Sequence, residues 1–78
     1  MDAHTRAVVR ALERAPCSLR ALAREARVSH VWLVQIQKGR RPVSAATAAK
    51  IAHALRLWAA TCGRLAAAID RSAPKGGS

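Results

Sequence analysis

The chain has 78 residues, which suffices for one small domain and leaves little room for a catalytic cavity walled on all sides. Apolar residues make up 51% of it, and because 19 of them are alanine, the composition favours several short, closely packed helices around a modest core. Lys and Arg outnumber Asp and Glu by 14 to 4, and a net charge of +10 on so small a body indicates an anionic partner, nucleic acid being the default.

The polar residues do not suggest an enzyme. Each acidic residue is placed as a helix cap or on a helix surface, and no glycine-rich loop is present to cradle a phosphate. The acidic residues are Asp2, Glu13, Glu25 and Asp70. The two cysteines, Cys17 and Cys62, lack the short spacing of a metal knuckle or a redox loop, so we expect neither metal nor cofactor.

No apolar run approaches the roughly 20 residues of a membrane span, because Arg56 and Arg64 interrupt the most apolar stretch. The first residues also lack the apolar stretch of a signal peptide. We therefore expect a cytoplasmic, nucleoid-associated protein with no membrane partner and no small-molecule ligand.

Two helices are expected in the first third of the chain. Asp2 is a suitable N-cap for the first, which Pro16 ends, and its apolar residues recur at helical spacing. Ser18 caps the second, which runs to Ala26. The inward residues are Val8, Val9, Leu12 and Ala15 in the first helix and Leu19, Leu22, Ala23 and Ala26 in the second.

A third helix follows a brief break at Arg27 and Val28. Ser29 caps it, Leu33 and Ile36 point inward, and it runs to about Lys38, where Gly39 stops it. A basic loop stiffened by Pro42 leads to a fourth helix, which Ser44 caps. The inner face of this fourth helix carries Ala48, Ile51, Ala52 and Leu55.

The residues after Leu57 form either a fifth helix, at 58–70, or a continuation of the fourth. One apolar stripe runs along them and needs a cover, which is either the rest of the core or a second copy of the chain. The stripe is the candidate dimer interface and consists of Trp58, Cys62, Leu65 and Ile69. We thus expect an all-α domain over residues 1–71 with four to five helices, followed by a disordered tail at 72–78.

Two short helices joined by a tight turn, at 18–26 and 29–38, form a helix-turn-helix pattern. Together with Ala23 at the contact between the helices and Gly39 after the second one, this pattern resembles the Cro and lambda-repressor-like (XRE) family over residues 17–57. The resemblance implies a compact helical bundle that binds double-stranded DNA, usually as a dimeric repressor or activator, with helix 29–38 in the major groove.

The sequence departs from the family pattern at three places. Arg27 stands in the turn where the family most often has glycine, so it must take a left-handed conformation at some cost or the turn must be reshaped. Leu19 replaces a glutamine that contacts DNA in many members. The outer face of helix 29–38 is also less polar than usual.

With Leu33 and Ile36 inward, the helical rotation turns Val31, Val34, Gln35 and Lys38 outward. Gln35 can form a bidentate pair with adenine, and valine can contact a thymine methyl group. By resemblance, the candidate base contacts are His30, Val31, Val34 and Gln35. The candidate contacts to the DNA backbone are Ser18, Arg20, Ser29, Trp32, Lys38, Arg40, Arg41 and Ser44.

Two other functions compete with a sequence-specific homodimeric repressor. Exposed Val31, Trp32 and Val34 would also suit a protein-interaction module, as in a phage- or plasmid-borne factor that docks on a larger machine. A nonspecific nucleic-acid binder would show strong salt dependence without preference among sequences.

Overall fold

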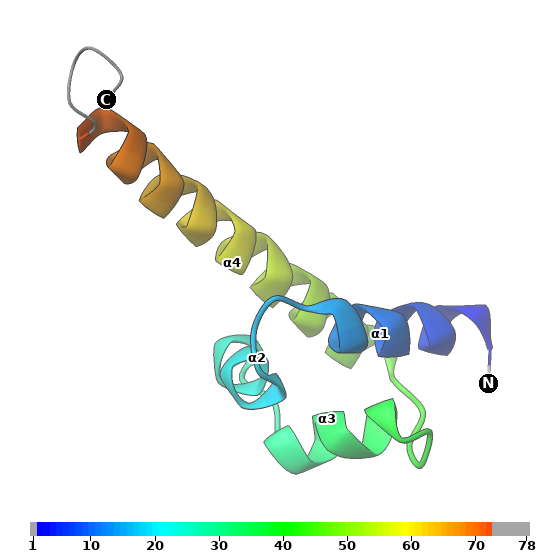
Figure 1. Cartoon of the computed structure of the whole chain (residues 1–78). Coiled ribbons are helices and arrows are strands. Elements are labelled where there is room, and N and C mark those ends of the chain that lie inside the picture. The colour runs from blue at the N-terminus through cyan, green and yellow to red at the C-terminus, as the bar shows by residue number, and fades with distance from the viewer. Residues whose placement is uncertain (1, 73–78) are drawn as a thin grey trace.

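The computed structural model describes residues 2–72, which form four α-helices and contain no strand (Figure 1). The helices are α1 (Ala3–Arg14), α2 (Leu19–Ala26), α3 (His30–Gln37) and α4 (Ala45–Ser72). The expected all-α class is confirmed. Ser72 was expected in a disordered tail, and this is wrong, because it is the last residue of α4 and its hydroxyl donates a 2.8 Å hydrogen bond to Ile69 O. The remainder of the expected tail lies outside the described residues.

Each helix begins at the cap that the sequence predicted. Asp2 Oδ1 accepts a 2.7 Å hydrogen bond from the Thr5 N–H, and this bond is the main reason that the pKa of the Asp2 carboxyl is lowered. The hydroxyl oxygens of Ser18, Ser29 and Ser44 accept from the backbone N–H three residues on, at 3.1, 3.3 and 3.1 Å. Local side-chain chemistry therefore sets all four N-termini.

The turn between α2 and α3 depends on an arginine in a left-handed conformation. Arg27 has φ 58° and ψ 45°, and its N–H bonds back to the carbonyl oxygens of Ala23 and Arg24. This confirms the first of the two alternatives for Arg27, since the turn keeps its tight form and the residue accepts the strain. At the end of α3 a glycine, Gly39, takes the equivalent conformation with φ 74°.

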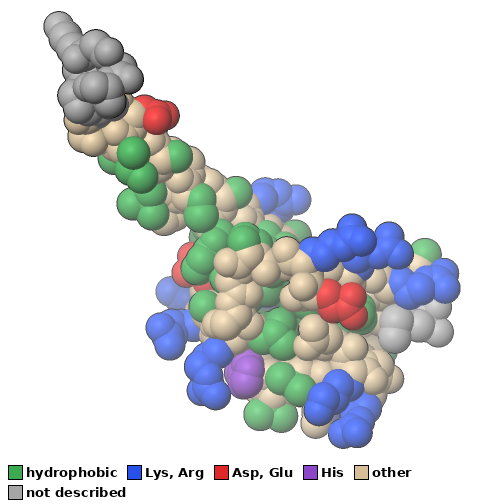
Figure 2. Space-filling view, viewed as in Figure 1, with side chains coloured by type: hydrophobic (Ala, Val, Ile, Leu, Met, Phe, Trp, Pro, Cys, Tyr) green, Lys and Arg blue, Asp and Glu red, His purple; other side chains and the backbone are tan. Residues whose placement is uncertain are grey.

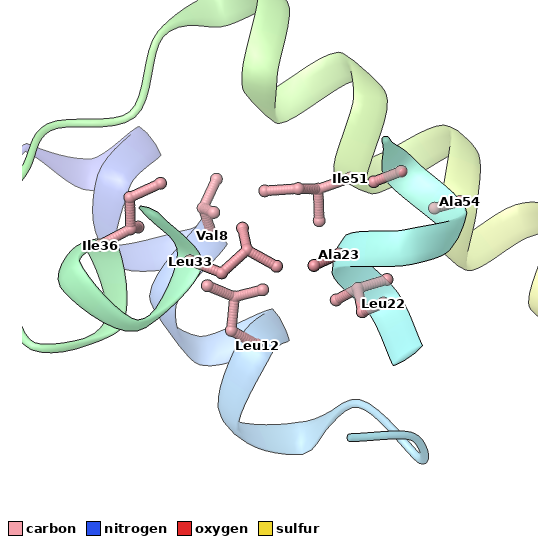
Figure 3. Packing of buried hydrophobic residues seen from close by; sticks show 9 residues of the cluster. Val8, Leu12, Leu22, Ala23, Leu33, Ile36, Ile51 and Ala54 are labelled. Carbon is pink, nitrogen blue, oxygen red and sulfur yellow. The ribbon is translucent and has the colours of Figure 1, made fainter. Parts of the chain in front are cut away.

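The core lies where the four helices meet, and Figure 3 shows side chains from all of them converging there. Leu22, Leu33 and Ile36 are the largest fully buried side chains. The other buried apolar residues are Val8, Leu12, Ala23, Ala26, Ile51 and Ala54. The expected inward faces are confirmed, with Val9, Ala15, Leu19, Ala48, Ala52 and Leu55 only half-buried. Buried Ala54 and Thr5 were not predicted.

The most distinctive feature is the length of α4, a single helix of 28 residues. At 1.5 Å per residue it is about 42 Å long, and Figure 1 shows its second half extending away from the other helices. The radius of gyration, 16.0 Å, exceeds the roughly 11.5 Å of a globular chain of this length. We call residues 2–58 the head and residues 59–72 the arm.

The arm decides whether the residues after Leu57 form a helix of their own. Within residues 2–72 they continue α4, and the stripe residues Leu65 and Ile69 are 61% and 70% exposed instead of packing on the core. Within those same residues, no helix combines the length and the apolar character needed to cross a membrane.

Candidate nucleic-acid interface

Helix α3 is held by its inner face and presents its outer face to solvent. Leu33 and Ile36 are fully buried against the neighbouring helices, whereas Val31 is 63% exposed. Val34 and Gln35 are half-buried at the two edges of the outer face. Of the four predicted base-contact residues, Val31 is therefore exposed, while Val34, Gln35 and His30, which lies in the first turn, are half-buried.

The loop after α3 folds back onto that surface through Arg41. Arg41 Nε donates a 2.6 Å hydrogen bond to Gln35 Oε1, and the Arg41 guanidinium carbon lies 3.9 Å from the centre of the Trp32 ring. Trp32 and Gln35 are one helical turn apart, so one arginine spans both. We call Trp32, Gln35 and Arg41 the Arg41 cluster. Sequence reasoning named all three residues without predicting that they would touch.

The same loop is fixed by its backbone. Gly39 N–H bonds to Ile36 O at 3.0 Å and Arg40 N–H bonds to Gln35 O at 2.9 Å, which caps the end of α3. The loop borders a hollow of about 300 Å³ against the start of α1. The hollow is lined by Asp2, Thr5, Gly39, Arg40, Arg41 and Pro42. Two arginines therefore lie in a short, hydrogen-bonded loop at the C-terminal end of α3.

A second hollow, of about 250 Å³, lies beside the N-terminal end of α3. Its lining residues are Arg27, Val28, Ser29, Trp32, Thr47 and Lys50. Two of them carry positive charge, and sequence reasoning gave neither a place in the interface. Lys50 is exposed on α4, and no local signal in the sequence places it beside Arg27, which belongs to the turn between α2 and α3.

The remaining predicted backbone contacts are distributed over four helix ends. Ser29 and Ser44 are exposed N-caps of α3 and α4, and the Ser44 hydroxyl also donates to Thr47 Oγ1 at 3.1 Å. Lys38 is exposed at the end of α3. Ser18 and Arg20 lie at the start of α2 and do not contribute to the Arg41 cluster or to either hollow.

Charge over this region is strongly one-sided. Between residues 18 and 50 the chain carries seven Lys or Arg side chains, all exposed, and one acidic side chain, Glu25. Figure 2 shows Lys and Arg gathered at both ends of the region where Figure 1 places α3, with no acidic side chain between them in this view. Such a field attracts a polyanion and repels a second basic surface.

The four predicted dimer-interface residues fall into two groups. Trp58 is half-buried where α4 leaves the head, whereas Cys62, Leu65 and Ile69 are exposed on the arm.

The second cysteine, Cys17, lies in the head, where burial raises the pKa of its thiol. Within residues 2–72, no three His, Cys, Asp or Glu side chains gather in a way that could hold a metal ion.

Comparison with known proteins adds no family: no protein-family model, curated protein or solved structure matches the chain.

Proposed function

We propose that the chain binds double-stranded DNA in a sequence-dependent way by inserting α3 into the major groove. The observation that carries this proposal is the combination of an outward α3 face, Val31 and Gln35, with exposed cations at both ends of the same helix. An α-helix fits the roughly 12 Å width of the groove, and the backbones on either side carry the phosphates that the cations would meet.

Gln35 and Arg41 are the residues best placed to read bases. The Gln35 carbonyl oxygen has a second lone pair beyond the one engaged by Arg41, and its amide nitrogen has two protons, so the side chain retains both halves of a bidentate pair with adenine. Arg41 engages Gln35 through Nε, which leaves its terminal nitrogens for a guanine edge or a phosphate. Val31 is suited to contact a thymine methyl group.

The cations beside the two hollows would meet the DNA backbone. Arg40 beside the first hollow and Lys50 with Arg27 beside the second would neutralise phosphates on the flanks of α3. Lys38, Arg41 and Arg20 on α2 bring the cations to six, enough to neutralise about six phosphates. The N-caps Ser18, Ser29 and Ser44 would add uncharged contacts to the same footprint. This footprint would set orientation on the duplex but not sequence preference.

A small transcriptional regulator, a repressor acting in the cytoplasm on nucleoid DNA, is the role we propose for such a binder. The helix-turn-helix arrangement of α2 and α3 and the family resemblance at Ala23 and Gly39 support it.

Selection of bound fragments from a random duplex library tests the proposal. We expect an enriched motif, and we expect Gln35→Ala to change the preferred base at one position of that motif. Gln37→Ala is the matched control, because Gln37 lies on the same helix on the side away from Val31. An unchanged preference in the Gln35→Ala variant would contradict a reading role for α3.

The rival functions predict different outcomes of the same selection. A nonspecific binder would retain duplexes without enriching any motif. A protein-interaction module would retain none at moderate salt, and its partner binding would be lost on Val34→Lys, whereas an added cation on α3 would cost a DNA binder less affinity than Gln35→Ala. Either result would overturn sequence-dependent DNA binding.

A further inference from the structure

We propose that the arm binds the arm of a second copy of the chain in antiparallel orientation, so that Leu65 of each chain packs against Ile69 of the other. This inference concerns assembly and does not depend on what the head binds.

The arm has an apolar face that the rest of residues 2–72 leaves uncovered. Leu65 and Ile69 are 61% and 70% exposed, and Cys62 is also exposed. They continue the stripe of Ile51, Leu55 and Trp58 at alternating steps of four and three residues, which is the spacing of a coiled-coil seam. Figure 2 shows hydrophobic side chains running along this part of α4 with few charged ones among them.

The borders of the stripe suit another α-helix of the same kind. Ala66 and Ala68 flank it on its two sides, and such small residues let two helices approach closely. Residues 59–72 carry a net charge of only +1, from Arg64, Asp70 and Arg71, all placed off the stripe. The arm therefore lacks both the basic rim that binds a membrane surface and the charges that would select a different partner chain. In a pair of identical chains, the uncharged apolar face of one arm would contact the same face of the other arm.

The charge of the head determines the orientation. Residues 2–58 carry eleven Lys or Arg and three Asp or Glu, a net charge of +8. Parallel arms would bring two such heads to the same end, whereas antiparallel arms place them at opposite ends of the pair.

The head also sets the register. Trp58 is already half-buried in the head, so the surface free for a partner begins near Cys62. Pairing Leu65 with Ile69 of the second copy centres the two-fold axis level with Ala67. The overlap then runs from Cys62 to Ser72 and stops short of either head.

The size of the DNA-free protein tests the pairing. Sedimentation velocity of the full chain across the micromolar range is expected to show a species of twice the chain mass, with Leu65→Glu and Ile69→Glu both monomeric at concentrations where the unchanged chain is dimeric. Ala60→Glu, on the opposite face of the arm, is the matched control and should remain dimeric. Circular dichroism confirms that each variant keeps its helices. A monomeric unchanged chain, or equal dissociation by Ala60→Glu, would overturn the proposal.

Crosslinking tests the orientation. In a Cys17→Ser, Cys62→Ser background, Leu65→Cys and Ile69→Cys chains of different mass are mixed and treated with a short bis-maleimide. The antiparallel register predicts that the product joining a Leu65→Cys chain to an Ile69→Cys chain dominates. Predominant products within each variant alone would indicate a parallel pair and refute the proposed register. Because no DNA is present, either result is independent of the proposed DNA binding.

Discussion

Arg41 and Gln35 are joined across the end of α3 by a 2.6 Å hydrogen bond from Nε to Oε1. The same guanidinium lies over the Trp32 ring. A solvent-exposed glutamine normally samples several rotamers, and fixing it before binding lowers the entropic cost of any contact it makes. The pair therefore acts as one preorganised unit on the surface of α3.

If the two residues act as a unit in DNA binding, the losses of binding free energy caused by substituting each of them will not be additive. Arg41→Ala and Gln35→Ala are each expected to weaken binding to the selected duplex by about 1–3 kcal/mol, and the double variant by less than the sum. Arg41→Lys should recover only part of the loss, since an ammonium cannot reproduce the guanidinium geometry. Fluorescence anisotropy at fixed salt measures all four. Strict additivity would show that the contact has no role in binding.

The phosphate footprint predicts a steep salt dependence. With about six phosphates neutralised per head, the logarithm of the binding constant should fall with the logarithm of salt concentration at a slope near −5. Arg40→Ala and Lys50→Ala should each make the slope shallower by about one, while Arg64→Ala on the arm should leave it unchanged. A slope shallower than about −2 for the unchanged chain would remove most of the electrostatic argument.

Relief of strain at Arg27 predicts a more stable protein. Its φ of 58° suits glycine better than arginine, so Arg27→Gly should raise the free energy of unfolding by about 0.5–1 kcal/mol, net of the greater entropy of the unfolded glycine chain. Denaturant unfolding measures the change. Because Arg27 also lines the basic hollow, the same variant should bind DNA less tightly, which separates its two effects. Arg24→Gly, inside α2, is the contrasting control and should destabilise.

The cap of α1 predicts a loss of stability in acid. The Thr5 N–H lowers the folded-state pKa of Asp2, so the carboxylate stabilises the fold fully above its unfolded-state pKa, and this contribution disappears as the pH falls through the lower, folded-state pKa. Asp2→Asn keeps an acceptor at the cap without titrating, so its stability should depend less on pH below the ordinary range of a carboxyl group. Thermal unfolding of both forms between neutral and strongly acidic pH checks this, and parallel curves would contradict it.

How much of the structure the sequence predicts depends on how far apart in the chain the interacting residues lie. The caps at Asp2, Ser18, Ser29 and Ser44 were predictable because each involves a backbone N–H three residues away. Leu33 and Ile36 were predictable because helical rotation alone turns them to the same side.

The features that sequence reasoning missed arise from segments that meet only in space. No local signal indicates that Arg41 returns to Gln35 or that Lys50 and Arg27 line the same hollow. The continuity of α4 was left undecided because Gly63 resembles a helix stop, yet the residue lies inside the helix with open space around it.

The arm has a further consequence for local stability. The arm, a helical segment of 14 residues that the head does not cover, is near the length at which isolated helices are only marginally stable in water. Its amide protons should therefore exchange with deuterium much faster than those of α3, whose inner face is sealed by Leu33 and Ile36. If arms pair, that exchange should slow as the protein is concentrated, so a single dilution series would report how much of the order in this helix comes from outside the chain.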